Sequence, residues 1–111
     1  MISSNALKNE MLNAMAIDSV SLHDGDPGEN GTDNELASAS YARQSCAFNA
    51  AVNGSRQLSA DVLFDLANGD AVAWIGYWEG TTFKGRVDVT DANMTADGQA
   101  ILQAANTALN L

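Results

Sequence analysis

The chain has 111 residues and a net charge of −9, with 14 acidic residues against five basic ones. We expect neither nucleic acid nor an anionic membrane as a partner, because both require a basic protein surface. A single cysteine excludes an intrachain disulfide, and no apolar run is long enough for a transmembrane helix. The N-terminus shows no signal-peptide pattern, so we expect folding in a reducing cytoplasm. The length fits one small domain, whose modest core leaves room for stabilisation by oligomerisation.

The N-terminal segment, residues 3–16, is predicted to form the one helix of the chain. A serine at position 3 or 4 suits the N-cap, and apolar side chains recur at helical spacing as a narrow stripe of Leu7, Met11 and Met15. A helix of this length is marginally stable alone in water, so it needs a surface to lie on. Two interpretations remain open: the helix packs on its own domain, or it reaches a neighbouring subunit as an N-terminal arm.

After the helix, hydrophobic and polar residues alternate with the period of two that is typical of strands. Strands are predicted at residues 17–23, 41–48, 58–66, 72–78, 82–89, 99–103 and 107–111. The segment 72–78 is apolar on both faces, which predicts a central strand covered on both sides or a strand with one face in an interface. Turns are predicted at the Asn-Gly pairs 53–54 and 68–69, at residues 79–81 and at residues 104–106.

The alternation also predicts which side chains share a face of each strand. Val20 and Leu22 oppose Ser19, Ser21 and His23 in the first strand. The side chains predicted to face inward in the next two strands are Ala42, Cys46, Phe48, Leu58, Ala60, Val62, Phe64 and Leu66, and those that share one face of 82–89 are Phe83, Val87 and Val89. Short strands joined by such turns favour a mainly β fold, an antiparallel β-sandwich or jelly-roll-like domain with one short N-terminal helix. We expect residues 1–16 to form the helical arm and residues 17–111 to form a single domain.

A long loop, residues 22–36, lies between the first two strands and holds five carboxylates, three glycines and the only proline. Loops of this length are uncommon unless they bind something or are held by a partner. Residues 26–28, Asp-Pro-Gly, predict a tight turn. Asp24, Asp26 and Glu35 have the spacing of the first, third and twelfth positions of a calcium loop, which makes them weak candidates for a cation. The residues between them do not fit that motif, so no metal and no cofactor is expected.

Residue types that enzymes use for chemistry are sparse. His23 is the one histidine, and we expect it to face solvent or to brace the loop rather than to take part in catalysis. The sequence gives no support for a zinc site, a phosphate-binding glycine loop or a paired-carboxylate pocket. Arg43 follows the acidic loop, and two interpretations of it remain open: it pairs with a carboxylate of its own loop, or with an acidic residue of a neighbouring subunit. The sequence therefore predicts a protein that is not an enzyme.

Several short elements of the loop and of the strand after it form a recognisable set: Leu22-His23, Asp26-Pro27-Gly28, Gly31, Glu35-Leu36 and Tyr41-Ala42-Arg43-Gln44. Together they resemble a family of small tailed-bacteriophage virion proteins, which are often labelled tail fibre or minor tail proteins. Residues 62–64, the aromatic segment 74–78 and residues 107–111 look similar to later parts of that family. The chain departs from the pattern at residues 37–40, Ala-Ser-Ala-Ser, where the family leads us to expect glycines.

The resemblance implies a non-enzymatic structural protein of the virion. Because the chain is compact and has no repeat or shaft, we expect a capsid decoration (cement) protein on the capsid surface. Such a protein would oligomerise, with a trimer favoured, and would stabilise contacts between subunits of the phage major capsid protein. The alternative is a tail, collar or fibre-associated virion subunit involved in host attachment. A third hypothesis, from another class, is a small hydrolase or carbohydrate-binding module.

Candidate contact residues follow from these hypotheses. The helix stripe and the aromatic strand are the candidates for contacts between subunits, and the loop 24–35 is the candidate for contact with the shell or the outside. The interface candidates are Leu7, Met11, Met15, Trp74, Tyr77, Trp78, Arg43, Asp33 and Glu35.

Overall fold

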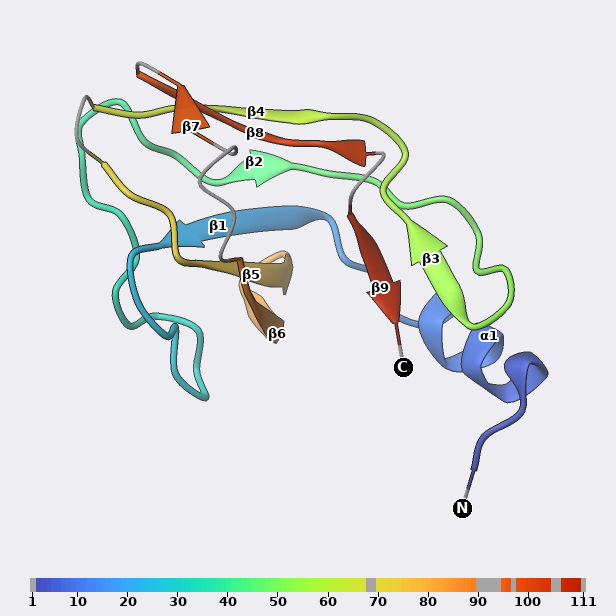
Figure 1. Cartoon of the computed structure of the whole chain (residues 1–111). Coiled ribbons are helices and arrows are strands. Elements are labelled where there is room, and N and C mark those ends of the chain that lie inside the picture. Colours follow the sequence, from blue (N-terminus) through green and yellow to red (C-terminus); the bar gives the residue numbers. More distant parts are fainter. Residues whose placement is uncertain (1, 68–69, 90–94, 97, 105–106, 111) are drawn as a thin grey trace.

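A computed structural model describes residues 2–67, 70–89, 95–96, 98–104 and 107–110 (Figure 1). The prediction of a mainly β, antiparallel protein with one short N-terminal helix is confirmed. Across these residues, no helix has the length and apolar character needed to cross a membrane. The predicted Asn-Gly turn at 68–69, part of the turn at 104–106 and the last residue of the strand at 107–111 lie outside the described residues.

The helix α1 (Asn5–Asn13) is shorter than predicted, and it begins where the sequence provides a cap. The Ser4 Oγ accepts a hydrogen bond from the Leu7 N–H at 3.2 Å, which satisfies one of the free donors of the first turn. The predicted stripe is not the buried face of the helix, because Leu12 is fully buried whereas Met11 is 43% exposed. Met15 lies beyond the helix end, where it packs against the core.

Polar side chains hold α1 on its own chain. The Asn13 Oδ1 accepts from the Ala51 N–H at 2.8 Å, and the Asn9 Oδ1 accepts from the Gly54 N–H at 2.9 Å. Gly54 belongs to the predicted hairpin turn, in which Asn53 and Gly54 both have positive φ, 53° and 78°. These values fit the two-residue turn that an Asn-Gly pair favours, so this turn prediction is confirmed.

A four-stranded antiparallel sheet forms one layer of the protein. Its order is β2-β1-β5-β6, and the strands are β1 (Ser19–His23), β2 (Gln44–Ser45), β5 (Trp74–Glu79) and β6 (Thr82–Asp88). The aromatic strand β5 is central, and Tyr77 and Trp78 are both 4% exposed although they lie on opposite faces. The prediction of a central strand covered on both sides is therefore confirmed.

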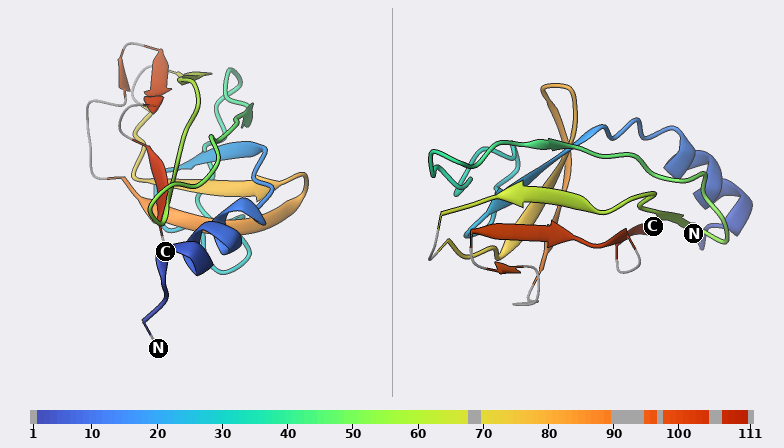
Figure 2. Two further views of the ribbon diagram at one scale, coloured as in Figure 1. Left: turned by 90° about the vertical axis from the view of Figure 1, so that its right-hand side faces the viewer. Right: turned by 90° about the horizontal axis from the view of Figure 1, so that it is seen from above.

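The other strands form two smaller sheets. One has the order β4-β8-β7, with β4 (Val62–Asp65), β7 (Thr95–Ala96) and β8 (Gln99–Leu102), and the other pairs β3 (Ser55–Gln57) with β9 (Ala108–Asn110). Figures 1 and 2 show β4 and β8 side by side across the four-stranded sheet, with α1, β3 and β9 at one end. The last two predicted strands exist, but they lie in different sheets, since β8 pairs with β4 and β9 pairs with β3.

The core fills the space between the layers. The inward face of the four-stranded sheet contributes Val20, Leu22, Ile75 and Tyr77, all less than 5% exposed. Phe48 packs edge-to-face on Tyr77 with ring centroids 5.9 Å apart. The other buried apolar residues of this cluster are Leu12, Ile17, Leu36, Leu58, Val62, Phe64, Leu66, Ala100, Leu102 and Leu109.

Two side chains that were predicted to face inward, Ala42 and Ala60, are exposed. Residues 41–48 contain only a short strand, and Ala42 is exposed rather than inward. Tyr41 takes its place by stacking on Phe64, with ring centroids 6.5 Å apart. Ala60 is exposed because the chain bends at residues 59–60, although Val62 beyond the bend is buried as predicted.

A β-bulge overturns the predicted face of β6. Trp78 pairs with Phe83, but Tyr77 pairs with Gly85, so Lys84 is an extra residue. An extra residue reverses the alternation, because side chains change face at every position of a regular strand. Phe83 therefore lies on the Trp78 face of the sheet, while Val87 lies opposite Ile75 on the inward face.

Candidate functional site

The acidic loop is a closed structure with its own hydrogen bonds. A bridge between His23 and Glu35 closes its neck, and the Leu36 N–H donates to the Leu22 carbonyl at 3.0 Å. Within the loop, the Asp26 Oδ1 accepts from the Gly28 N–H at 2.9 Å. Gly28 has a φ of +77°, which the predicted Pro-Gly turn requires at its third position. The loop is therefore a compact connection with a defined shape.

The loop lies on the outward face of the four-stranded sheet. Gly31 has a φ of +76°, and a Cβ atom there would be 2.1 Å from the Phe83 ring. Glycine is thus required at this position on two grounds, conformation and space. The bulge at Lys84 provides the contact, because it turns Phe83 to the face that the loop covers.

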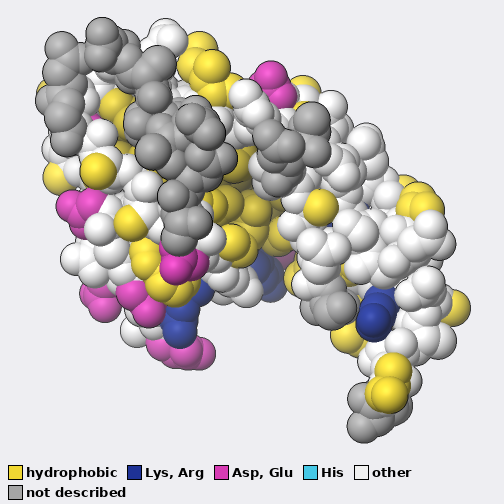
Figure 3. Space-filling view, viewed as in Figure 1, with side chains coloured by type: hydrophobic (Ala, Val, Ile, Leu, Met, Phe, Trp, Pro, Cys, Tyr) yellow, Lys and Arg dark blue, Asp and Glu magenta, His cyan; other side chains and the backbone are white. Residues whose placement is uncertain are grey.

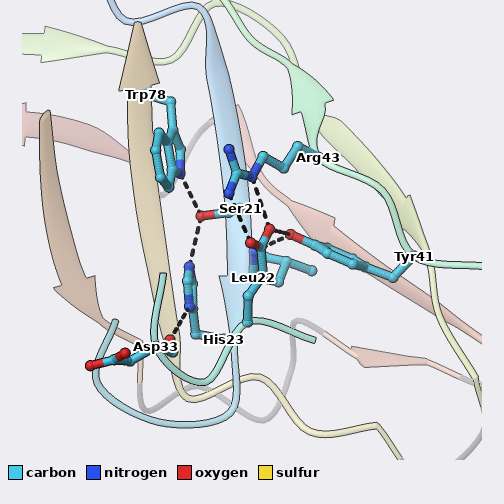
Figure 4. A network of polar contacts seen from close by, with 8 residues as sticks. Ser21, Leu22, His23, Asp33, Tyr41, Arg43 and Trp78 are labelled. Carbon is cyan, nitrogen blue, oxygen red and sulfur yellow. Dashed lines mark hydrogen bonds and ion pairs between the residues drawn. The ribbon is translucent and has the colours of Figure 1, made fainter. Parts of the chain in front are cut away.

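A chain of hydrogen bonds links the sheet to the loop (Figure 4). The Trp78 Nε1–H donates to the Ser21 Oγ at 2.8 Å, the Ser21 Oγ lies 2.7 Å from the His23 Nε2, and the His23 Nδ1 lies 2.8 Å from the Asp33 carbonyl oxygen. A carbonyl only accepts, so His23 Nδ1 carries a proton, and in the tautomer that this fixes the Nε2 accepts from the Ser21 O–H. Every donor in the chain then points the same way, from Trp78 toward the loop.

The Trp78–Ser21 and Ser21–His23 hydrogen bonds are buried, and the bond from His23 to the loop is partly buried. Ser21 and His23 are both 0% exposed. The backbone of the central strand seals them, since a Cβ on Gly76 would be 2.5 Å from the Ser21 Oγ. Two environments were predicted for His23. The prediction that it braces the loop agrees with its hydrogen bond to Asp33, and the prediction that its ring faces solvent is wrong. An approaching substrate would not reach the Ser21 hydroxyl in this arrangement.

A second polar cluster pins the C-terminal end of the loop. The Arg43 guanidinium donates to both carboxylate oxygens of Glu35, from Nε at 2.9 Å and from Nη2 at 2.8 Å. The Tyr41 O–H donates to the same carboxylate at 2.6 Å and accepts from the Leu22 N–H at 3.1 Å. The guanidinium also lies 3.8 Å from the centroid of the Trp78 ring, a cation–π contact. The interpretation that Arg43 pairs with its own loop is confirmed.

This cluster shifts the acidity of its members. Burial raises the pKa of Glu35, but the hydrogen bonds from Arg43 and Tyr41 and the charge of Arg43 together outweigh burial and leave the pKa lowered. Burial, followed by the hydrogen bond to Glu35, raises the pKa of Tyr41. The arrangement thus favours a charged Glu35 and a neutral Tyr41, which is the state in which all the observed bonds form.

Arg86, which lies on β6, forms ion pairs with the tip of the loop. Its Nε lies 3.3 Å from the Asp26 Oδ1, and its Nη1 lies 3.8 Å from the Glu29 Oε2. The Glu29 side chain is 95% exposed, so this pair contributes little to stability. Two arginines therefore hold the loop, Arg43 at its neck and Arg86 at its tip.

The weak cation candidates do not converge in the structure. Glu35 is engaged by Arg43 and Tyr41, and Asp26 is engaged by Gly28 and Arg86. Among the residues that the structure describes, no three acidic, histidine or cysteine side chains gather as a metal site would require.

The predicted interface residues occupy very different environments. Tyr77 and Trp78 are buried within the chain, and Glu35 and Arg43 pair with each other. Met11 and Asp33 are exposed, and Leu7, Met15 and Trp74 are partly buried. Surfaces available to another chain therefore include the helix and the loop, whereas the aromatic strand contributes little to the surface.

Sequence reasoning missed the role of Ser21 and Trp78. The alternation did predict that Ser21 and His23 share one face of their strand. Trp74, Gly76 and Trp78 lie two residues apart in the sequence, which is the spacing of residues on one face of a strand. Pairing of those two strands was the missing information, because Ser21 lies opposite Gly76 in the register.

Comparison with known proteins gives one family. Residues 3–99 match the model of a family described as "Podophage GP4 fiber I protein gp80". No curated protein and no solved structure was found to match the chain. The match covers the helix, the acidic loop and the strands through β7, and it agrees with the resemblance to phage tail fibre proteins. The chain belongs to the podophage GP4 fiber I protein gp80 family, a family of phage virion structural proteins.

Proposed function

We propose that this protein is a non-enzymatic, fibre-associated subunit of the phage tail that takes part in host attachment. The observation that carries the proposal is the match of residues 3–99 to a phage fiber family. A subunit of this kind must present a fixed surface outside the particle. The acidic loop is a surface of this kind, because its shape is set by internal hydrogen bonds and its ends are held by Arg43 and Arg86.

The buried Ser21–His23 pair supports a structural role over a hydrolytic one. A catalytic serine needs an accessible oxygen, whereas the Ser21 Oγ is enclosed and engaged by both Trp78 and His23. The pair supplies rigidity to the loop instead. A carbohydrate-binding module gains no support either, since Trp78 is 4% exposed.

The expectation of a capsid decoration protein receives less support than the alternative. The matching family is described as a fiber protein, and nothing in its description refers to the capsid. We therefore propose a position at the tail, in place of a position on the capsid surface in contact with the major capsid protein.

Electron microscopy of intact particles tests the proposed position. Fab fragments raised against the purified protein should label the tail or its fibres. Labelling spread over the head would overturn the tail assignment in favour of decoration.

Host attachment is tested separately by competition. Purified protein added in excess should slow adsorption of the phage to its host. A variant carrying Asp26→Asn, Glu29→Gln and Asp33→Asn should compete less well if the loop makes the contact. A variant carrying Glu10→Gln, Asp61→Asn and Asp65→Asn, three exposed acidic residues outside the loop, loses the same charge and is the matched control. Unchanged adsorption with excess wild-type protein would contradict the attachment role.

A further inference from the structure

The strand β6 lies at the end of the strand order β2-β1-β5-β6, so one of its sides has no partner strand among the described residues. We call that side the free edge. Arg86, Val87 and Asp88 in the second half of β6 are all exposed, Val87 by 43%. A strand at the edge of a sheet presents a row of N–H and C=O groups that can pair with a further strand. Figure 3 shows basic side chains among acidic ones where β6 and the acidic loop reach the surface.

The hydrogen bonds of β1 determine which residues of β6 face the free edge. The N–H and the C=O of Leu22 both bond to groups outside β5, so Leu22 faces away from β5. Backbone groups of successive residues in an antiparallel sheet point to opposite sides. Those of Ile75, which lies opposite Leu22, therefore point to Val87 of β6. It follows that Arg86 and Asp88, on either side of Val87, direct their N–H and C=O groups to the free edge.

The side chains along the free edge alternate in charge and in face. Arg86 and Asp88 are two residues apart, so they share the outward face of the sheet, and Val87 between them faces inward. Arg86 binds the tip of the acidic loop through Nε and Nη1, at 3.3 and 3.8 Å, and its side chain is still 35% exposed. A guanidinium has five N–H donors, so Arg86 can bind a further carboxylate beside those of the loop.

Two copies of β6 can pair antiparallel about a two-fold axis in few registers, because only residues that face the edge exchange hydrogen bonds. With the axis at Val87, Arg86 of each copy lies opposite Asp88 of the other. With the axis at Arg86 or at Asp88, that residue lies opposite its own copy. With the axis at Gly85, Lys84 lies opposite Arg86. Like charges directly opposite each other destabilise a strand pair and opposite charges stabilise it, so the register centred on Val87 is favoured.

We propose that two copies of the chain pair through the free edges of β6, antiparallel and centred on Val87. The contact continues the four-stranded sheet from one copy into the other, as strands do in β-augmentation. It places two Arg86–Asp88 pairs on the outward face and brings the two exposed Val87 side chains together on the inward face. A two-fold contact between identical surfaces closes on itself, so the unit is a dimer, whereas the sequence led us to expect a trimer. The inference goes beyond the tail assignment and does not depend on it.

Two single variants of the full chain test the register by charge. Asp88→Arg places arginine opposite arginine across the contact, and Arg86→Asp places aspartate opposite aspartate. Each alone should lose about tenfold or more in association constant relative to the wild type. An equimolar mixture should dimerise, because each variant supplies the charges that the other lacks. Asp65→Arg, at an exposed aspartate on β4, is the control with the same change of charge as Asp88→Arg and should dimerise like the wild type.

Sedimentation velocity over a range of concentrations measures association. A salt concentration of about 0.15 M largely screens the repulsion between two acidic chains, and circular dichroism verifies that each variant is folded. A wild type that stays monomeric, single variants that associate like the wild type, or a mixture that stays monomeric would each overturn the proposal.

A double variant separates the contact from the loop, because Arg86→Asp also removes the ion pairs to the acidic loop. Arg86→Asp combined with Asp88→Arg loses the same loop pairs but restores opposite charges across the two-fold axis. The double variant should therefore regain the association that Arg86→Asp loses. Equally weak association of the two would contradict the proposed pairing of Arg86 with Asp88.

A cysteine at the axis tests the register without a change of charge. The two copies of residue 87 form a non-hydrogen-bonded pair, in which Cα atoms lie about 4.5 Å apart, within reach of a disulfide. In a chain with Cys46→Ala, Val87→Cys should form a disulfide-linked dimer under mild oxidation. Val52→Cys is the control, because Val52 is 64% exposed and lies outside β6, and it should stay largely monomeric. Equal cross-linking of the two variants, or none at residue 87, would contradict the proposed axis.

Discussion

Arg43 donates two hydrogen bonds to the Glu35 carboxylate, at 2.9 and 2.8 Å, and the same guanidinium lies 3.8 Å from the centroid of the Trp78 ring. One side chain thus joins the neck of the acidic loop to the central strand of the sheet. Bidentate pairing and ring stacking both use the planar shape of arginine, so lysine is not an equivalent replacement.

Arg43→Lys should lower the free energy of unfolding by about 1 kcal/mol, because it loses one hydrogen bond and the stacking on Trp78. The magnitude is modest because the Arg43 side chain is 34% exposed. Urea denaturation followed by tryptophan fluorescence measures the change. Lys84→Ala is the control, since Lys84 and Glu79 are 3.8 Å apart on the surface and their loss should change little. Equal effects of the two substitutions would contradict the role of Arg43 as the anchor of the loop.

Stability should fall in acid through Glu35. Its folded pKa is lowered from the ordinary value of 4.5, so the unfolded chain binds a proton more readily than the folded one. The stabilisation is present above pH 4.5 and is lost as the pH falls through the folded pKa. Glu35→Gln should be less stable than the wild type at neutral pH, with the difference shrinking in acid. Melting temperatures recorded from pH 7 down to pH 3 measure this, and a constant difference would refute the assignment to Glu35.

Stability should also fall in strong base through Tyr41, whose folded pKa is raised from the ordinary value of 10.0. The unfolded tyrosine ionises first, so the stabilisation is complete below pH 10 and is lost as the pH rises toward the folded pKa. Tyr41→Phe should reduce this loss. Unfolding free energies measured between pH 8 and pH 11 test it. Tyr77→Phe is the reference, because Tyr77 is also buried but no carboxylate contributes to its pKa shift. Its pKa is raised to about 12, chiefly by burial.

Gly76→Ala should destabilise the protein by about 1–3 kcal/mol, because overpacking a rigid interior forces side chains from their positions. The added Cβ would lie 2.5 Å from the Ser21 Oγ and 3.2 Å from both His23 Nε2 and Phe83 Cε1. Gly85→Ala is a matched control in the next strand, where a Cβ has open space. Thermal melting of the two variants should differ clearly, and equal melting temperatures would contradict the tight packing of the buried network.

Ser21→Ala should cost about 1–3 kcal/mol, because it leaves the Trp78 N–H and the His23 Nε2 buried without their partner. Ser45→Ala, at an exposed position in β2, is the control and should be nearly neutral. Nitrogen NMR of His23 provides an independent check, since the network requires the proton on Nδ1 in the wild type. A ring protonated on Nε2 alone would contradict the direction of the hydrogen-bond chain.

Sequence patterns predicted the parts of the fold that depend on local alternation and turn chemistry. The central position of β5 followed from its uninterrupted apolar character, and the turn at Asn53-Gly54 followed from the preference of that pair for positive φ. The bracing role of Arg43 followed from its position after a run of carboxylates. These features are encoded within a few residues of one another.

Features that depend on pairing between distant strands could not be predicted. The bulge at Lys84 reversed the faces of Phe83 and Val87, and no local pattern marks an extra residue in one strand. The strand β3 was missed because its residues, Ser-Arg-Gln, show no apolar alternation. The Arg56 side chain in this strand donates to the carbonyls of Leu12, Met15, Phe48 and Asn49. These residues lie far from Arg56 in the sequence or on the other side of a turn, so a local pattern does not predict the contacts.

The central claim is that this member of a phage fiber family occupies the tail, and its copy number in the virion tests that claim most directly. Quantitative mass spectrometry of purified particles gives the ratio of this protein to the major capsid protein. A tail position predicts a small ratio, a few copies of an oligomer on each particle. A ratio approaching that of a shell component, with one or more copies for every capsomer, would contradict the tail assignment and favour decoration of the capsid.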